Sequence, residues 1–226
     1  MNLNPGRGPA ARVAGGVVVA GMLLASAGYV AAHPHTWVEA RATLHFDAEY
    51  RIDGIAVSLA IDEMTTSVLV EGLDADGNGR FDPGELQALA EDNAAALEEF
   101  GFFTEIRAAD RPAPVAGLRS HNYRFEAGRL ILTLDLALET AIDPTLQAVT
   151  IRLYDPTYYV MVELAADGPV AFADIAPEYC AASIAPPDHG AEIQLSEATF
   201  ETDDPSLDTI GREFADVITI ACPPHG

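Results

Sequence analysis

The sequence contains no lysine. All 12 of its basic residues are arginines, against 35 Asp and Glu, so the 226-residue chain has a formal net charge of −23 at pH 7. A chain of this charge repels nucleic acid and anionic lipid surfaces and attracts cations. We therefore expect metal ions as partners and no nucleic-acid partner.

Cysteine is also scarce, and the sequence contains only Cys180 and Cys222. Their separation is far from the Cys-x-x-Cys spacing of thiol metal or redox sites. In an exported chain, an even number of cysteines predicts one disulfide, which would close a loop of about 40 residues and contribute about 3–4 kcal/mol.

The sequence also lacks a Gly-x-Ser-x-Gly motif, a His-Glu-x-x-His motif and a glycine-rich phosphate loop. We therefore predict that the protein is not an enzyme.

Long apolar runs are absent except near the start. Val13–Val30 follows Arg7 and Arg12, contains no acid and leads into Ala31-Ala32. This pattern predicts a secretory signal peptide over residues 1–32 with cleavage before His33; a membrane anchor is the rival interpretation. Cleavage would remove two arginines and no acid, leaving a periplasmic or secreted chain of charge −25 that does not insert into the membrane.

Residues 33–222 are expected to form one α+β domain, followed by a tail at 223–226. Thr36–Phe46 alternates apolar and polar residues, and Ile55–Ile61 repeats the pattern as a hairpin partner. Asp62 is expected to cap a helix with an apolar face formed by Met64, Val68, Leu69 and Leu73. Asp82-Pro83-Gly84-Glu85 predicts a second helix start with a capping box, running to Gly101.

The pattern then returns to period two. Short strands are expected over Phe103–Arg107, Tyr123–Phe125, Leu130–Leu138, Val149–Leu153, Tyr158–Leu164, Tyr179–Ile184 and Val217–Cys222, with an irregular arm at 185–206 and a short helix at Pro205–Phe214. We predict antiparallel β-sandwich-like sheets with an inserted helix–loop–helix (EF-hand-like) unit at about 62–100. The disulfide would join the last strand to the strand of Cys180.

Residues 74–85, DADGNGRFDPGE, match an EF-hand-type calcium loop. Such a loop takes side-chain oxygens at positions 1, 3 and 5, a carbonyl at 7, an acid or water at 9, Glu at 12 and Gly at 6. The predicted ligands are Asp74, Asp76, Asn78, the Arg80 carbonyl, Asp82 and Glu85, with Gly79 at the bend. The alternative is a solvated acidic turn, in which unscreened carboxylates would repel one another. Since no second loop is found, a structural role for Ca²⁺ is favoured over a sensor role.

His33-Pro34-His35 would become the new N-terminus. A free amine and two imidazoles form a candidate transition-metal site, and Pro34, which has no N–H, prevents the planar copper(II) or nickel(II) site that uses that amide nitrogen. Zn²⁺, or Ni²⁺ held through the imidazoles, is therefore preferred. The alternative is two surface histidines that bind nothing, because spacing identifies no further ligand. The candidates are Glu105, His121 and His45, of which His45 lies about 33 Å along an extended strand from His35 and is too distant.

Five stretches together resemble a known family: His33-Pro34-His35, Ile61-Asp62-Glu63-Met64, the calcium-type loop, Phe103-Thr104 and Tyr154-Asp155-Pro156-Thr157-Tyr158-Tyr159-Val160. From His33 to Cys222 the chain resembles the bacterial periplasmic family of domain of unknown function 1007, often labelled an uncharacterised transport-system periplasmic component. The resemblance implies a role beside inner-membrane permeases of the nickel/cobalt type, some of which handle zinc, with the His-Pro-His end as metal ligand. Glu105 departs from the family, whose members tend to have His after Phe-Thr, and this leaves the identity of the metal open.

Two functions follow as expectations. The first is a periplasmic calcium-binding accessory protein of a nickel, cobalt or zinc transport system, which captures or delivers metal through His33 and His35. The second is a calcium-stabilised extracellular interaction or adhesion module without metal cargo. An enzyme that uses Asp155 and the neighbouring tyrosines is a third interpretation, although packing of these tyrosines on a sheet face is favoured.

Overall fold

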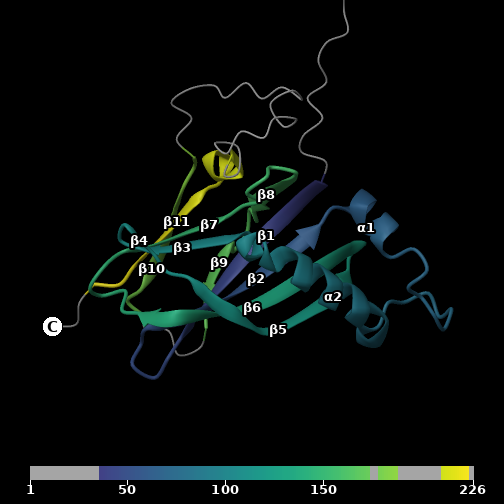
Figure 1. Ribbon diagram of the computed structural model, residues 1–226, viewed down its shortest axis with the longest axis horizontal. Helices are drawn as coiled ribbons and strands as arrows, with labels where there is room; N and C mark the ends of the chain where they lie inside the picture. The colour runs from purple at the N-terminus through teal and green to yellow at the C-terminus, as the bar shows by residue number, and fades with distance from the viewer. Residues whose placement is uncertain (1–35, 174–177, 188–209, 224–226) are drawn as a thin grey trace, which may run out of the picture. The chain divides into compact units, whose positions relative to one another are not determined.

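The computed structural model describes residues 36–173, 178–187 and 210–223 (Figure 1). These residues all belong to one compact unit. The expected signal peptide at 1–32, His33, His35, most of the expected arm at 185–206, residues 205–209 of the expected short helix and residues 224–226 of the tail lie outside the described residues.

The described residues form two β-sheets and two α-helices, which is an α+β fold. Sheet A has the order β5-β6-β2-β1-β8, with β9 also on β1, and sheet B has the order β10-β11-β7-β3-β4. The strands of sheet A are β1 (Thr36–Phe46), β2 (Ile52–Ile61), β5 (Val115–Glu126), β6 (Arg129–Ile142), β8 (Val160–Leu164) and β9 (Val170–Phe172). Those of sheet B are β3 (Thr104–Ala108), β4 (Arg111–Pro112), β7 (Val149–Leu153), β10 (Ala181–Ala185) and β11 (Val217–Ala221).

The alternating pattern of β1 is confirmed by burial. Val38, Ala40, Ala42, Leu44 and Phe46 all lie in the core, while the residues between them are partly or fully exposed. β1 pairs antiparallel with β2, and β2 with β6, whose leucines at even positions from Leu130 to Leu138 face the same core. Residues of both sheets and of α2 (Pro83–Glu98) contribute to this single hydrophobic core.

The prediction of purely antiparallel sheets is wrong for sheet A. β8 and β9 both run parallel to β1, with Val38 opposite Val162 and Ala42 opposite Val170. The chain reaches β8 from β7, which belongs to sheet B, so no hairpin forces β8 to run antiparallel to β1. β4 and β9 were not predicted, because two and three residues are too short to show an alternating pattern.

The predicted apolar face of the first helix is also wrong in part. In α1 (Glu63–Leu69), Met64 is 72% exposed and Val68 is 68% exposed, whereas Leu69 and Leu73 pack against the core. The buried residue of α1 is Thr66, whose hydroxyl donates to the Ile61 carbonyl and accepts from the Leu130 N–H of β6 at 3.1 Å. A hydrogen-bonded threonine therefore fixes α1 to sheet A, and Met64 and Val68 face solvent.

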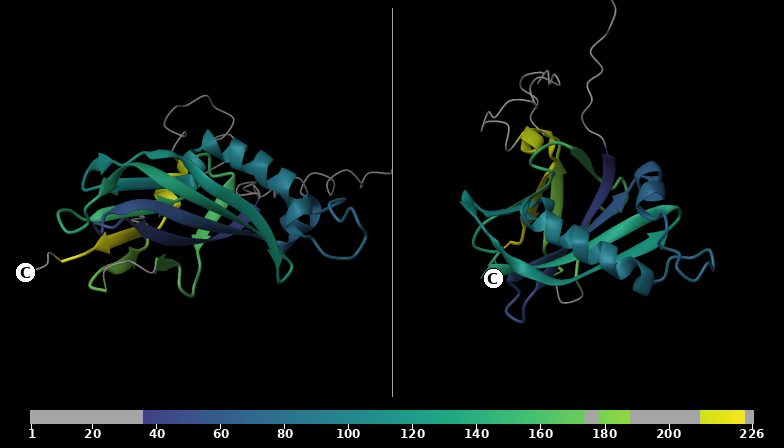
Figure 2. Two further views of the ribbon diagram at one scale, coloured as in Figure 1. Left: turned by 90° about the horizontal axis from the view of Figure 1, so that it is seen from below. Right: turned by 45° about the vertical axis from the view of Figure 1, so that its right-hand side comes forward.

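The second helix forms as its sequence predicts. Leu86, Ala90 and Ala94, spaced by four residues, are its buried side chains, and the helix packs along β5 (Figure 2). A short 3₁₀ turn, η1 (Gly101–Phe103), follows at the predicted stop and leads into β3.

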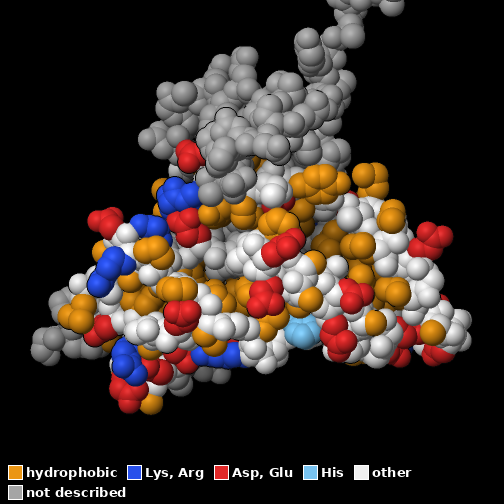
Figure 3. Space-filling model, in the orientation of Figure 1, with side chains coloured by type: hydrophobic (Ala, Val, Ile, Leu, Met, Phe, Trp, Pro, Cys, Tyr) orange, Lys and Arg blue, Asp and Glu red, His pale blue; other side chains and the backbone are white. Residues whose placement is uncertain are grey.

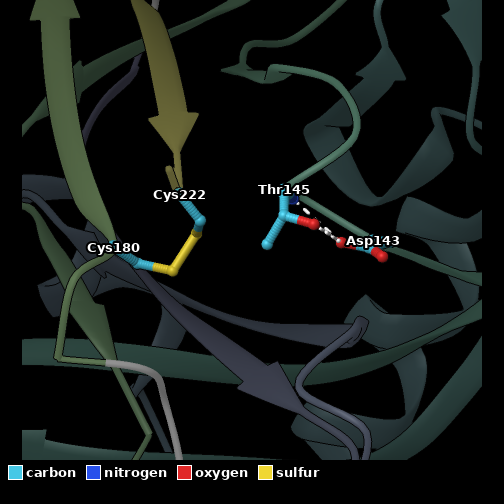
Figure 4. Close-up of a disulfide and its surroundings, with 4 residues drawn as sticks. All are labelled: Asp143, Thr145, Cys180 and Cys222. Atoms are coloured by element: carbon cyan, nitrogen blue, oxygen red, sulfur yellow. Dashed lines mark hydrogen bonds between the residues drawn. A yellow bond between two sulfur atoms is a disulfide. The ribbon is translucent and has the colours of Figure 1, made fainter. Parts of the chain in front are cut away.

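The predicted disulfide between Cys180 and Cys222 is confirmed. Their Cα atoms lie 4.2 Å apart, and the bond joins the ends of β10 and β11, which pair antiparallel from Ala181 opposite Ala221 (Figure 4). The 3₁₀ helix η3 (Ile210–Phe214) precedes β11, so the described part of the predicted short helix has the tighter 3₁₀ form. No helix in the described ranges is long and apolar enough to cross a membrane.

Candidate metal site

The acidic loop begins after a turn rather than at the end of α1. Val70 caps α1, and Gly72, with φ of 80°, closes a turn in which Leu73 N–H donates to the Val70 carbonyl at 3.1 Å. Residues 70–73 therefore separate α1 from the loop. A left-handed backbone at Gly72 ends the helical path, and glycine adopts it without steric cost.

The far end of the loop is fixed by a capping box on α2. The Asp82 side chain accepts from Gly84 N–H at 2.8 Å and from Glu85 N–H at 3.1 Å, while Glu85 Oε2 accepts from Asp82 N–H at 3.1 Å. This confirms the predicted helix start. The two side chains satisfy N–H groups that have no partner within the helix.

Three carboxylates converge at the loop. Ligand oxygens of Asp74, Asp76 and Glu85 all lie within 4.8 Å of one another. Because Ca²⁺–oxygen distances are about 2.3–2.6 Å, two oxygens on one ion are separated by at most about 5 Å. The Ala75 N–H donates to Glu85 Oε1 at 2.8 Å and so ties the first residues of the loop to its last. The spacing of these oxygens fits a single Ca²⁺ ion.

Backbone N–H groups hold the two aspartates in this arrangement. Asn78 N–H lies 3.0 Å from Oδ1 of both Asp74 and Asp76, and Gly79 N–H donates to Asp74 Oδ2 at 2.9 Å. Gly79 has φ of 77°, as the predicted bend requires. Each carboxylate oxygen has two lone pairs, so accepting one N–H leaves a lone pair for a cation.

The residues of the remaining predicted ligands make hydrogen bonds within the loop or with the start of α2. Arg80 is exposed and its N–H donates to Asn78 Oδ1 at 2.8 Å, while the Asn78 amide nitrogen donates to Asp76 Oδ2 at 2.7 Å. Asp82 lies outside the converging group, since its side chain caps α2. Asp82 would therefore bind an ion through a water molecule, which is how the residue at position 9 of such loops often contributes.

The loop is also anchored by an aromatic contact. Phe81, at position 8, packs edge to face against Phe125 of β5 with ring centroids 4.9 Å apart.

The ligand atoms of the three converging carboxylates are all oxygens, and the three side chains carry three formal negative charges. This chemistry suits a hard divalent cation such as Ca²⁺ and not a metal that prefers thiolate or imidazole.

A second group of charged residues surrounds Glu105 of β3. Its carboxylate accepts two hydrogen bonds from the Arg212 guanidinium, at 2.8 and 2.9 Å, and one from the Tyr154 hydroxyl at 2.9 Å, with Arg152 at 3.5 Å. Hydrogen bonds from Arg212 hold the pKa of Glu105 below its usual range. Burial, together with the hydrogen bond to Glu105, raises the pKa of Tyr154 to about 12.

These contacts bear on Glu105 as a candidate ligand for the His33–His35 site. Both of its oxygens are engaged by Arg212, so in this arrangement Glu105 serves as an ion-pair partner and not as an open ligand. Sequence reasoning missed Arg212, because it lies 107 residues further along the chain and no local pattern links the two.

The Tyr154–Val160 stretch is a turn organised by Asp155. Asp155 is buried, and its side chain accepts from Thr157 N–H, the Thr157 hydroxyl and Val160 N–H, each within 2.9 Å. Gly211 of η3 sits against this turn, where a Cβ would collide with the Asp155 carbonyl. Asp155 therefore shapes the turn that receives η3.

The candidate histidines lie on separate strands. His45, on β1, faces Asp135 of β6 with Nε2 3.5 Å from Oδ1. His121, on β5, lies opposite Leu134. Among the residues that the structure describes, neither histidine joins a group of three converging ligands.

Comparison with known proteins identifies the family of the chain. No curated protein matches the chain significantly. A family model described as "Protein of unknown function (DUF1007)" matches residues 18–222, nearly the whole chain. The acidic loop, the Glu105 group and the Asp155 turn all fall within this match, and the chain belongs to the DUF1007 family.

Proposed function

We propose that the protein is an exported calcium-binding accessory component of a transition-metal transport system. The observation that carries the calcium part is the convergence of Asp74, Asp76 and Glu85 oxygens within 4.8 Å in a loop held by its own backbone N–H groups. Three carboxylates at this distance repel one another, and a bound divalent cation removes that repulsion. In this proposal Asn78, the Arg80 carbonyl and a water on Asp82 complete the coordination shell.

The calcium ion has a structural role in this proposal. The loop connects the turn after α1 to the first turn of α2, and Phe81 fastens it to β5. An ion that binds the folded loop and not the unfolded chain stabilises the fold. Extracellular modules bind Ca²⁺ at about 10⁻⁴–10⁻³ M, so a compartment that holds Ca²⁺ at or above this concentration would keep the site filled.

The transition-metal part rests on the sequence His33-Pro34-His35. In the proposal, the imidazoles and the amine exposed by cleavage take up Zn²⁺ or Ni²⁺ and pass it to an inner-membrane permease. The sequence motif and the absence of an N–H at Pro34 support this choice of metal. Because imidazoles bind metal only when neutral, affinity at this end should fall below about pH 6.5.

A second candidate function is a calcium-stabilised interaction module without metal cargo. The specific observation in its favour is the pair of apolar side chains, Met64 and Val68, that α1 presents to solvent beside the loop. Both candidates share the calcium site and differ in whether a transition metal binds.

Metal titration by calorimetry distinguishes the two candidates. The chain beginning at His33 should bind one Ca²⁺, and Glu85→Gln should weaken that binding at least about tenfold, while Asp92→Asn, which removes one charge from the exposed face of α2, should not. A His33→Ala, His35→Ala double variant should lose Zn²⁺ or Ni²⁺ binding, with His189→Ala, His225→Ala as the matched control. Equal transition-metal affinity in both double variants would reject the delivery role and leave the interaction module. Unchanged Ca²⁺ binding in Glu85→Gln would reject the calcium site.

A further inference from the structure

The structure contains an apolar groove between α1, α2 and sheet A. Its volume is about 390 Å³, within the range of about 300–1,000 Å³ found for ligand pockets. Leu69 of α1 and Ala96 and Leu97 of α2 form its walls, and Val38, Leu59 and Ile61 of the sheet form its floor. Its polar lining residues are Thr36, Thr65, Tyr159 and the pair Asn93 and Tyr123, whose side chains are joined by a hydrogen bond of 2.8 Å.

The apolar surface continues from the groove over α1. Thr65 and Leu69 line the groove, and Met64 and Val68, each one position earlier, form the adjoining row on the helix surface and are exposed to solvent. Figure 3 shows hydrophobic side chains gathered over α1 and the adjoining end of the sheet, with Asp and Glu side chains around them. Contiguous apolar surface with a polar rim is typical of an interaction site.

The charge of the surrounding segment restricts the partner. Residues 62–100 carry eleven Asp and Glu and a single base, Arg80. Glu63 on α1 and Glu99, the C-cap residue of α2, are exposed at the ends of the two helices that bound the groove. Such a rim attracts a cationic partner and repels both anionic lipid and a second copy of this chain.

The backbone of the groove floor restricts the partner's conformation. Val38 of β1 pairs with Ile61 on one side and Val162 on the other, and Leu59 pairs with Ala40 and Leu132. A docking segment that lies over this floor therefore finds no free strand edge, because β1 and β2 are interior strands of sheet A, and it must be held by side chains. An amphipathic helix meets this requirement, since its apolar face fills such a groove through residues spaced by three and four.

From these observations we propose that the groove between α1, α2 and sheet A binds a cationic amphipathic helix of a partner protein. The apolar face of that helix occupies the groove and packs on Met64 and Val68, and its Arg or Lys side chains face the acidic rim. The site lies outside the acidic loop, so the proposal does not depend on calcium binding.

Fluorescence anisotropy with a labelled peptide tests this proposal. The probe is a peptide of about 18 residues, built from Leu and Arg so that a helix of about 27 Å is amphipathic. The full chain should bind it more tightly than a scrambled peptide of the same composition or an amphipathic peptide with Glu in place of Arg. Affinity should fall as NaCl rises from about 0.05 to about 0.5 M, because salt screens the rim charges.

Matched variants locate the binding surface. Met64→Ser, Val68→Ser should weaken binding at least about fivefold, while Leu146→Ser, which removes an 80% exposed leucine elsewhere, should change it by less than about twofold. Ala96→Arg, which puts a cation into the groove wall, should weaken it about tenfold, and the neighbouring Ala95→Arg, outside the groove lining, should not.

Several results would overturn the proposal. Equal binding of the scrambled peptide would indicate electrostatic attraction without a groove, and unchanged binding in the Met64, Val68 and Ala96 variants would exclude this face. Dimerisation in sedimentation experiments that is lost in the Met64, Val68 variant would assign the face to a second copy. Binding to neutral phosphatidylcholine vesicles without peptide binding would assign it to a membrane.

Discussion

At the scale of single residues, a few polar side chains connect parts of the chain that are distant in sequence. Thr66 joins α1 to β6, Asp155 shapes the turn that receives η3, and Glu105 joins β3 to Arg212 of η3. Each is at least partly buried and hydrogen bonded, so its loss leaves an unsatisfied partner inside the protein. The loss of stability is largest where the unsatisfied partner carries a charge.

We predict that Glu105→Gln destabilises the protein by about 1–3 kcal/mol at neutral pH, because the Arg212 guanidinium would keep its position without a compensating charge. The folded-state pKa of Glu105 is lowered, so its contribution is present above the unfolded pKa of about 4.3 and is lost as pH falls through the folded value. The difference in melting temperature between wild type and variant should therefore shrink below about pH 4.

The matched control for this prediction is Glu126→Gln. Glu126 pairs with Arg124 at 3.1 Å, but both side chains are at least half exposed, and exposed pairs contribute little. Thermal melts from pH 3 to pH 8 would compare the two variants. Equal, pH-independent losses in both would contradict a special role for the Glu105 ion pair.

At the scale of elements, α1 depends on one buried hydroxyl. Thr66→Val keeps the size of the side chain but removes the acceptor for Leu130 N–H, which lies 3.1 Å away inside the protein. We expect a loss of about 1–3 kcal/mol in the free energy of unfolding, measured by urea denaturation. Ser67→Ala, which removes an exposed hydroxyl one residue later on the same helix, should cost much less.

β10 depends on the disulfide in a similar way. All five of its residues are exposed, and among the described strands β11 is its one partner, at the edge of sheet B. A Cys180→Ala, Cys222→Ala double variant should lose about 2–4 kcal/mol. Hydrogen exchange should accelerate most at the Ala182 and Ile184 amides, whereas Val57 and Leu134 in the centre of sheet A should retain their relative protection. Uniform acceleration across both sheets would show that β10 is not an independent unit.

Local signals made some elements predictable. The alternation over Thr36–Phe46 matches β1 residue for residue, and the Asp82 and Glu85 capping box correctly placed the start of α2. The apolar spacing of Met64 and Val68 predicted a helix but not which way it faces, because the same pattern occurs on a core face and on a binding face. In the structure this pair faces solvent, and Thr66 is the buried residue of α1.

Contacts between distant segments were not predictable. Period-two alternation shows that residues 160–164 form a strand but not whether it runs parallel or antiparallel to its neighbour. The pairing of Glu105 with Arg212 depends on the position of η3 on the Tyr154–Val160 turn, which no local pattern encodes. The convergence of Asp74, Asp76 and Glu85 could be predicted from the sequence, because all three carboxylates belong to one loop of twelve consecutive residues.

At the scale of the whole molecule, the net charge of −23 makes stability sensitive to cations. If the loop binds Ca²⁺ at about 10⁻⁴–10⁻³ M, then 10 mM Ca²⁺ should add about 1.4–2.7 kcal/mol relative to chelated protein. For a domain of this size, that corresponds to a rise in melting temperature of about 3–10 °C.

General screening by salt must be separated from site binding in this measurement. NaCl at matched ionic strength also reduces self-repulsion, but it should act equally on wild type and on Glu85→Gln. Only the wild type should gain the additional rise with Ca²⁺. If both proteins gain the same rise, the acidic loop is not the site of calcium binding.

The Cys180–Cys222 bond also gives the protein a closed covalent ring near its C-terminus. A protease that cuts one peptide bond between these residues would open the ring without releasing a fragment, because the two new ends remain joined through sulfur. β11, which pairs with both β7 and β10, would stay attached to the rest of the chain. On a gel, such a nicked molecule would migrate as one band until reductant is added, and only then as two.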